Sequence, residues 1–196
     1  MTRIIITGNP GVGKHTIGSA IAKKLNYPII DLNKFVILNS TILKSTRGDS
    51  LDVDVKAASI ALKKELNNRD NLIIIGHLAP YLLRSNQIDF AAILRRHPKQ
   101  LLQVYNKRKY VMSKIKDNIT CEILGVCSYD VLRRFGRTKI GEFDTSITNI
   151  PKTVKNIIAA VKSESTRNFG MIDWLSKIEN EREIIDLILF DHNQVC

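Results

Sequence analysis

Short apolar runs alternate with longer amphipathic segments along most of the chain. The runs cover residues 4–6, 29–30, 72–75 and 90–94, and a weaker one covers 140–143. Runs without polar alternation are typical of strands buried on both faces of a parallel sheet. The segments 17–25 and 55–66 between them carry apolar residues at helical spacing. This pattern predicts an α/β fold in which a five-stranded parallel sheet is flanked by helices.

A glycine-rich stretch follows the first apolar run directly. It reads GNPGVGKHT at residues 8–16 and leads into the amphipathic segment 17–25. Glycines let consecutive backbone N–H groups turn inward around an anion, and a helix N-terminus adds partial positive charge. Lys14 follows the last glycine and can reach the terminal phosphates of a nucleotide. A chance glycine-rich turn is the alternative, but the flanking strand and helix favour a phosphate site formed by Gly11, Val12, Gly13, Lys14, His15 and Thr16.

One position of this loop departs from the general P-loop pattern. His15 stands where a Ser or Thr normally holds magnesium, and Thr16 comes one residue later. Adenylate kinases use a loop of the form GxPGxGKGT, which also lacks a hydroxyl at that position, and Pro10 and Thr16 fit it. The loop therefore favours a nucleoside monophosphate kinase-like P-loop fold. We expect Mg²⁺ to arrive with ATP, with Thr16 as its candidate contact in the loop.

Polar residues follow three of the predicted strands. Asp31 ends the second strand, His77 comes just after the third, and Arg95 follows the fourth. Ligands of parallel α/β sheets bind at the carboxyl ends of the strands. We therefore predict that Asp31 and Arg95 bind substrate and that His77 takes part in catalysis. A packed or capping histidine and a surface-loop arginine are the alternatives.

Residues 32–66 are expected to form a flap over an acceptor nucleotide. The stretch 32–50 has weak periodicity and many Asn, Ser and Thr, and Gly48 is a hinge or a turn. Asp52 and Asp54 precede the helix predicted for 55–66. We predict Asp52 as a further substrate contact, although either acid could instead cap that helix.

The middle of the chain predicts a basic lid. A helix over 101–105 leads to the sequence KRKY at 107–110, and the pattern indicates one helix over 114–129. We expect a lid at about 105–122 that closes over ATP and contributes Arg108. The P-loop domain would then span 1–162, leaving 163–196 as a helical extension with short helical patterns around Trp174 and Ile184.

Composition adds a charge argument and bounds the class. The 196 residues carry a net charge of +11, and the segment 95–139 holds twelve Lys or Arg against three acids. Either a phosphotransfer site or an RNA-facing patch would explain this excess. No run reaches the length of a membrane helix and no signal peptide precedes the loop, so we expect a cytoplasmic protein without a membrane partner. The cysteines, Cys121, Cys127 and Cys196, lack metal-ligand spacing.

Several separated blocks resemble one branch of the adenylate kinase superfamily. They are the loop at 8–16, His77, the pair Leu94-Arg95, and KRKY at 107–110 followed by KIKDNITCEI at 114–123. The chain is similar there to the archaeal and eukaryotic nuclear adenylate kinase-like ATPases of small ribosomal subunit maturation. The resemblance implies Lys14 as the phosphate lysine, Arg108 as the lid arginine and His77 as a motif histidine.

The same resemblance implies an activity and partners. It implies weak adenylate kinase activity with ATP and AMP, ATPase activity, and binding to a small-subunit ribosomal protein and pre-rRNA. Many family members carry an acid where Ile75 stands here, two residues before His77, which weighs against magnesium held by the protein. Three functions thus stay open: an adenylate kinase with ATPase activity, an ATP-dependent switch that chaperones a ribosomal protein or binds RNA, and a binding-only pseudoenzyme. We favour the first, acting in ribosome maturation.

Overall fold

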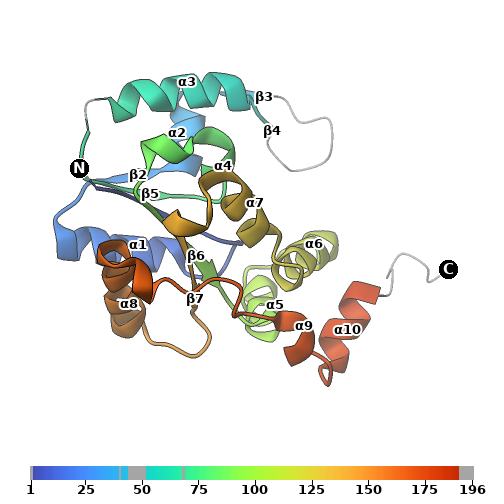
Figure 1. The fold of residues 1–196 in the computed structure, drawn as a ribbon. Helices are drawn as coiled ribbons and strands as arrows, with labels where there is room; N and C mark the ends of the chain where they lie inside the picture. Colours follow the sequence, from blue (N-terminus) through green and yellow to red (C-terminus); the bar gives the residue numbers. More distant parts are fainter. Residues whose placement is uncertain (1, 40, 44–51, 68, 190–196) are drawn as a thin grey trace.

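The computed structural model describes residues 2–39, 41–43, 52–67 and 69–189. Its main sheet has five parallel strands in the order β2-β5-β1-β6-β7 (Figure 1). They are β1 (Arg3–Thr7), β2 (Ile29–Asp31), β5 (Leu72–Ile75), β6 (Phe90–Arg95) and β7 (Ile140–Asp144). Each of the five predicted runs lies in one of these strands, so the prediction of a five-stranded parallel sheet is confirmed.

Helices cover both faces of this sheet. One face is covered by α1 (Lys14–Leu25) and α8 (Ile150–Lys162), and the other by α3 (Val55–Leu66), α4 (Ala79–Leu82) and α7 (Val126–Phe135) (Figure 1). Successive side chains of a strand point to opposite faces. Ile4 and Ile6 of β1 therefore pack in one core cluster and Ile5 in the other, all fully buried. This explains why the strands read as unbroken apolar runs.

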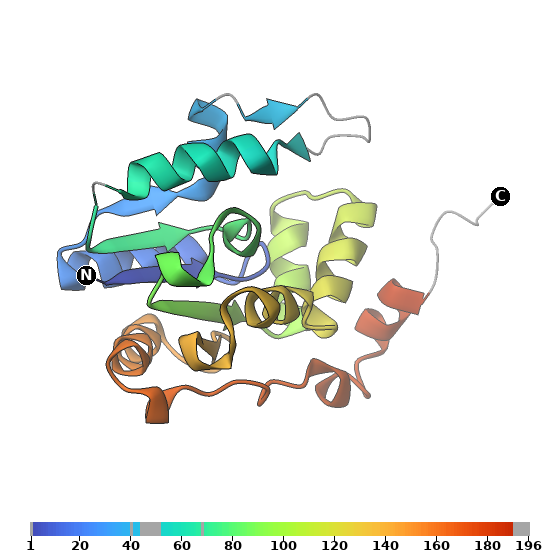
Figure 2. The ribbon, with the colours of Figure 1, turned by 45° about the horizontal axis from the view of Figure 1, so that its top comes forward.

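The carboxyl end of the sheet is covered by a separate group of helices. The helix α5 (Pro98–Lys107) follows β6, and α6 (Met112–Ile123) packs beside it (Figure 2). The expected single helix over 114–129 is wrong, because α6 ends at Ile123 and α7 begins at Val126. Gly125 separates them with a φ of 66°, a conformation that glycine adopts at little cost.

The segment 32–66, predicted to form a flap, contributes more buried residues to the core than its sequence indicated. The helix α2 (Leu32–Leu38) buries Leu32 and Val36 beneath it. A two-stranded antiparallel ribbon of β3 (Ile42–Leu43) and β4 (Asp52–Val53) then leads to α3. Asp54 caps α3 by accepting a hydrogen bond from the Ala57 amide at 2.9 Å. Gly48 lies outside the described residues.

The C-terminal segment packs against the rest of the domain. The two helical patterns expected there are α9 (Trp174–Lys177) and α10 (Arg182–Leu189). The buried residues of this segment, Trp174, Ile178, Ile184 and Leu187, belong to the same core cluster as the inner faces of α1 and α6. Short 3₁₀ helices at Ser85–Gln87, Arg137–Lys139 and Glu164–Thr166 complete the elements. Across the described ranges, no helix has the length and apolar character needed to span a membrane.

Candidate functional site

The glycine loop between β1 and α1 has the backbone of an anion nest. Gly8, Gly11 and Gly13 have φ values of 134°, 84° and 99°. A Cβ on Gly8 would lie 2.3 Å from the carbonyl oxygen of Leu94, so this position requires glycine for space as well as for conformation. Gly13 is the N-cap of α1 and provides no side-chain hydrogen bond there. The helix N-terminus thus directs its partial positive charge to the loop.

Surrounding elements hold the carbonyl oxygens of this loop. The Tyr105 hydroxyl donates to the Pro10 oxygen at 2.7 Å, and the Thr145 hydroxyl donates to the Val12 oxygen at 3.0 Å. Arg96 donates to the Gly11 oxygen at 3.2 Å. These donors come from α5, from the segment after β7 and from the segment after β6, and they fix the loop's conformation before any ligand binds.

Lys14 lies at the first turn of α1 and is 8% exposed. Its Nζ donates to the carbonyl oxygens of Gly8 and Asn9, both at 2.8 Å. Burial lowers the pKa of Lys14 to about 8, and the negative charge of Glu122 acts in the opposite direction. The ammonium group is therefore mostly charged at neutral pH, but more easily deprotonated than an exposed lysine.

A cavity of about 400 Å³ opens above the loop. Its cationic side chains are Lys14, Arg96 and Arg108, and its lining contains no carboxylate among the described residues. Its full lining is Pro10, Gly11, Gly13, Lys14, His15, Thr16, Asn33, His77, Arg96, Val104, Arg108 and Tyr110. A cavity that combines fixed cations with a backbone nest fits a polyphosphate.

His77 follows β5 and reaches this cavity. Burial, and then the charge of Lys14, lower the pKa of His77 below its ordinary value, so the imidazole is neutral at pH 7. A neutral imidazole provides one hydrogen-bond donor and one acceptor. It can therefore contact a phosphate oxygen or a water without adding charge.

Most of the predicted nucleotide-binding residues meet at one place. Gly11, Gly13, Lys14, His15, Thr16, His77 and Arg108 all line the cavity. Val12 is buried instead and takes part through its carbonyl oxygen. Asp31 lines a neighbouring cavity of about 490 Å³, which shares His15 with the first. Nδ1 of His15 lies 3.5 Å from Oδ2 of Asp31.

Two predicted substrate residues lie elsewhere. Arg95 was expected to reach phosphate, but it is 3% exposed and forms ion pairs with Glu122 at 2.7 Å and Glu142 at 3.0 Å. Its guanidinium is thus committed to buried carboxylates, and its neighbour Arg96 lines the cavity. Asp52 lies exposed on the β3–β4 ribbon, paired with Leu43, and not at the carboxyl edge of the main sheet.

Sequence reasoning missed several residues that shape the site. Asn33, Val104 and Tyr110 line the cavity, and Tyr110 stacks on Tyr105 with ring centroids 5.3 Å apart. The Asn9 side chain donates to Oε2 of Glu122 at 2.7 Å. The KRKY sequence could have indicated Tyr110. The contact between Asn9 and Glu122 joins residues 113 apart in the sequence, so it has no local signal.

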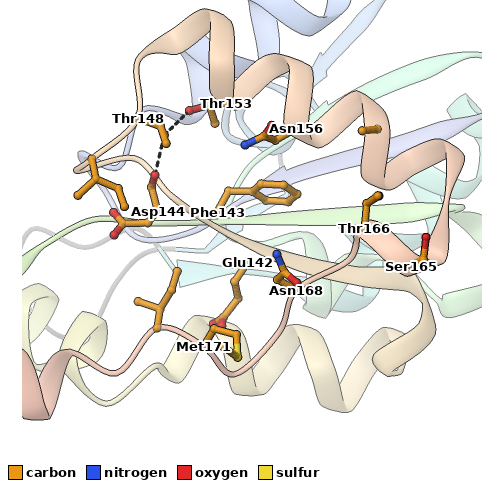
Figure 3. Close-up of a pocket in the computed structure, with 13 residues that line it drawn as sticks. Glu142, Phe143, Asp144, Thr148, Thr153, Asn156, Ser165, Thr166, Asn168 and Met171 are labelled. Atoms are coloured by element: carbon orange, nitrogen blue, oxygen red, sulfur yellow. Dashed lines mark hydrogen bonds between the residues drawn. The ribbon is translucent and has the colours of Figure 1, made fainter.

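A third cavity, of about 560 Å³, lies between β7, α8 and the segment 165–172 (Figure 3). Glu142, Asp144, Asn156 and Asn168 are among its polar residues. Its described lining contains no Lys, Arg or His. This cavity therefore does not fit a phosphate group.

The described residues also contain no group of three or more His, Cys, Asp or Glu that could hold a metal ion. Thr16, the predicted magnesium contact of the loop, lines the phosphate cavity together with His15, and the position of Ile75 offers no carboxylate.

The strand, glycine nest, buried lysine and parallel sheet together define a P-loop nucleotide-binding protein. A family profile described as "AAA domain" matches residues 4–125. Proteins named "Putative adenylate kinase" from Pyrococcus abyssi and Methanocaldococcus jannaschii are each 30% identical to this chain, covering 87% and 89% of it and 90% and 94% of their own lengths. The chain therefore belongs to the adenylate kinase-like family of P-loop proteins.

A solved structure agrees with this fold. Shikimate kinase from Bacteroides thetaiotaomicron superposes with a TM-score of 0.56 at 20% identity, covering 83% of this chain and 99% of its own. At that identity the likeness concerns the fold alone. The prediction of a P-loop kinase-like fold is confirmed.

Proposed function

We propose that this protein is an adenylate kinase-type phosphotransferase that also hydrolyses ATP slowly. The supporting observation is the phosphate cavity, where the nest, Lys14, Arg96 and Arg108 converge. The names of its relatives support a nucleotide kinase in particular. The substrates would be MgATP and AMP, with magnesium entering on the nucleotide.

The transfer needs positioning and charge neutralisation more than a nucleophilic side chain. An oxygen of the AMP phosphate attacks the γ-phosphorus of ATP, the bond from that phosphorus to the β,γ-bridging oxygen breaks, and two ADP result. Lys14 and the loop amides bind the phosphates of ATP. Arg108, exposed at the C-cap of α5, neutralises charge that develops on the transferred group.

The acceptor would lie on the side of Asp31 and His77. Asp31 borders the cavity of about 490 Å³ beside the phosphate cavity, and His15 lines both. His77, neutral at pH 7, would orient the AMP phosphate or, when AMP is absent, the water that hydrolyses ATP. In this proposal the same site performs both reactions.

The test is ADP production from MgATP with and without AMP, using Lys14→Ala as the control. We expect an AMP-dependent rate that saturates, a much slower rate without AMP, and loss of both in the variant. A slow rate that AMP does not change would identify an ATP-driven switch instead. Nucleotide affinity that survives Lys14→Ala would contradict the assignment of the site.

A second candidate function is supported by exposed cations on α5, α6 and α7 and in the turns beside them. Lys107, Lys109 and Lys114 are exposed on α5, α6 and the turn between them, and Arg133 and Arg137 are exposed at the end of α7 and just beyond it. We propose that this basic surface binds ribosomal RNA, and that the protein acts with a small-subunit ribosomal protein in ribosome maturation. RNA affinity should then fall steeply with salt. Affinity that is weak and insensitive to salt would remove the support for this role.

A further inference from the structure

The carboxylate of Glu122 joins the phosphate loop to the C-terminal segment. Glu122, on α6, is fully buried. Its Oε2 accepts a hydrogen bond from the Asn9 side chain at 2.7 Å, and its Oε1 accepts one from Nε1 of Trp174 at 2.9 Å. Asn9 belongs to the glycine loop, and Trp174 begins α9. One side chain therefore contacts both segments directly.

The buried charges around Glu122 fix its orientation. Arg95 donates to Oε1 of Glu122 at 2.7 Å and to Oε1 of Glu142 at 3.0 Å. Ser128 donates to the same Glu142 oxygen at 2.5 Å. A buried network with every member paired is rigid, and each donor to a carboxylate helps to fix its orientation. Trp174 supplies one of the donors that hold Glu122 in place.

The C-terminal segment is held at a second point. The Gly170 amide donates to Oε2 of Glu142 at 2.9 Å, and the Glu142 amide donates to the Asn168 carbonyl oxygen at 2.7 Å. Figure 3 shows Glu142 of β7 beside Asn168 and Met171 of this segment. The Trp174 ring is 1% exposed and makes an edge contact with His97, with ring centroids 5.3 Å apart. The indole is thus fixed in position and direction.

The contacts continue from Asn9 to the phosphate lysine. The Asn9 carbonyl oxygen accepts a hydrogen bond from Nζ of Lys14 at 2.8 Å, while the Asn9 side chain is held by Glu122. A continuous series of contacts therefore joins Trp174 to Lys14 through Glu122 and Asn9. A loop held in its binding conformation loses less freedom when it takes a ligand.

We propose that Trp174 is a positioning residue, which holds the phosphate loop in its nucleotide-binding conformation through Glu122. The C-terminal segment thereby sets the affinity of the site for ATP. This inference rests on the proposed nucleotide-binding function. It assigns to the segment a role in the site itself, beyond its packing.

The main experiment measures ATP affinity of the full chain by calorimetry, for wild type and Trp174→Phe. Phenylalanine keeps an aromatic ring but lacks the N–H group, and we expect ATP affinity to fall about tenfold. The matched control is Ile184→Val, which removes one methylene from the same segment and removes no hydrogen-bond donor or acceptor. It should keep ATP affinity within about twofold of wild type.

A second measurement keeps Trp174 intact and uses its fluorescence. Trp174 is the single tryptophan of the chain. ATP binding to wild type should change its emission, and Asn9→Ala should reduce that change by more than about half at saturating ATP, because the contact to Glu122 is lost. If Trp174→Phe does not fold, this fluorescence measurement still tests the positioning role of Trp174.

The possible outcomes distinguish a failure of this inference from a failure of the proposed function. The inference is overturned if Trp174→Phe binds ATP within about twofold of wild type, if Ile184→Val weakens binding equally, or if Asn9→Ala leaves the emission change intact. Wild type that binds no ATP would overturn the proposed function, and this inference with it.

Discussion

His15 and Asp31 lie side by side at the carboxyl edge of the sheet, with Nδ1 of His15 3.5 Å from Oδ2 of Asp31. The other carboxylate oxygen of Asp31 accepts hydrogen bonds from the amides of Asn33 and Lys34 at 3.0 and 3.3 Å, and so caps α2. One carboxylate therefore caps a helix and lies beside the imidazole that lines both cavities. Its charge and its capping role can be tested apart.

Asp31→Asn should separate these two roles. Asparagine caps helices as well as aspartate, so the melting temperature should change little. In the proposed acceptor site the Asp31 carboxylate accepts hydrogen bonds from hydroxyl or amino groups of AMP, and a neutral amide accepts weaker ones, so we expect the KM for AMP to rise by about tenfold. Steady-state ADP production at varied AMP measures this. An unchanged KM would remove Asp31 from the acceptor site.

ATP affinity should depend on pH through Lys14. The pKa of Lys14 is lowered by burial to about 8, and bound phosphate favours the charged form. As pH rises above about 8, the free protein loses the proton that binding requires, so affinity should fall by up to about tenfold per pH unit. Calorimetry from pH 7 to pH 9.5 checks this against Lys14→Ala, whose affinity should be low and nearly flat.

The lowered pKa of Lys14 also makes folding stability depend on pH, but stability should rise with pH where ATP affinity falls. Between about pH 8 and the ordinary lysine value of 10.5, the unfolded chain holds a proton at Lys14 that the folded chain has released. Lys14 therefore costs folding stability below about pH 8, and this cost is relieved as pH rises through that window. Lys14→Ala should be more stable than wild type at pH 7, by an amount that shrinks above pH 8 in parallel urea titrations.

Arg108 and Lys109 form a matched pair for the role of the lid. Both are exposed, but only Arg108 lines the phosphate cavity. Arg108→Ala should lower kcat for ADP formation by about 10²-fold or more, because it removes a cation from the transferring phosphate. Lys109→Ala should leave kcat within about twofold and match the stability of Arg108→Ala. Equal rates for the two variants would contradict the role given to Arg108.

Substitution of Arg95 should lower folding stability, whereas substitution of its neighbour Arg96 should lower ATP affinity. Arg95→Met leaves Glu122 and Glu142 buried without their cation, which costs about 3–5 kcal/mol of unfolding free energy. Arg96 is partly exposed and contacts the Gly11 oxygen. Arg96→Met should change stability by less than about 1 kcal/mol and weaken ATP binding instead. Urea denaturation and calorimetry on both variants check the pair.

Local sequence patterns were sufficient to predict most of the fold and the phosphate loop. The apolar runs predicted every strand of the main sheet, because strands buried on both faces leave no room for polar alternation. They did not predict the β3–β4 ribbon. The loop was predictable because its glycines, Lys14 and the following helix are adjacent in sequence. Gly125 also lies within the segment read as one helix, and it was the available signal for the break between α6 and α7.

The residues that sequence reasoning misplaced depend on distant contacts. Arg95 is the last residue of β6 and meets Glu122 and Glu142, which lie 27 and 47 residues further along the chain. No local sequence pattern indicates whether such an arginine pairs with buried carboxylates or binds a ligand. Trp174 is a related case: its short helical pattern predicted a helical extension, and nothing in the local sequence indicated that its N–H donates to Glu122.

The strand order has a consequence for how the chain can assemble. The central strand β1 is made first, yet its partners β5 and β6 begin only at Leu72 and Phe90. The contact from Trp174 to Glu122 must wait longer still. During synthesis the apolar residues of β1 therefore remain unpaired until more than a third of the chain has emerged. The nest of the glycine loop, which depends on Tyr105, Arg96 and Thr145, should form only late in folding, as the whole domain closes.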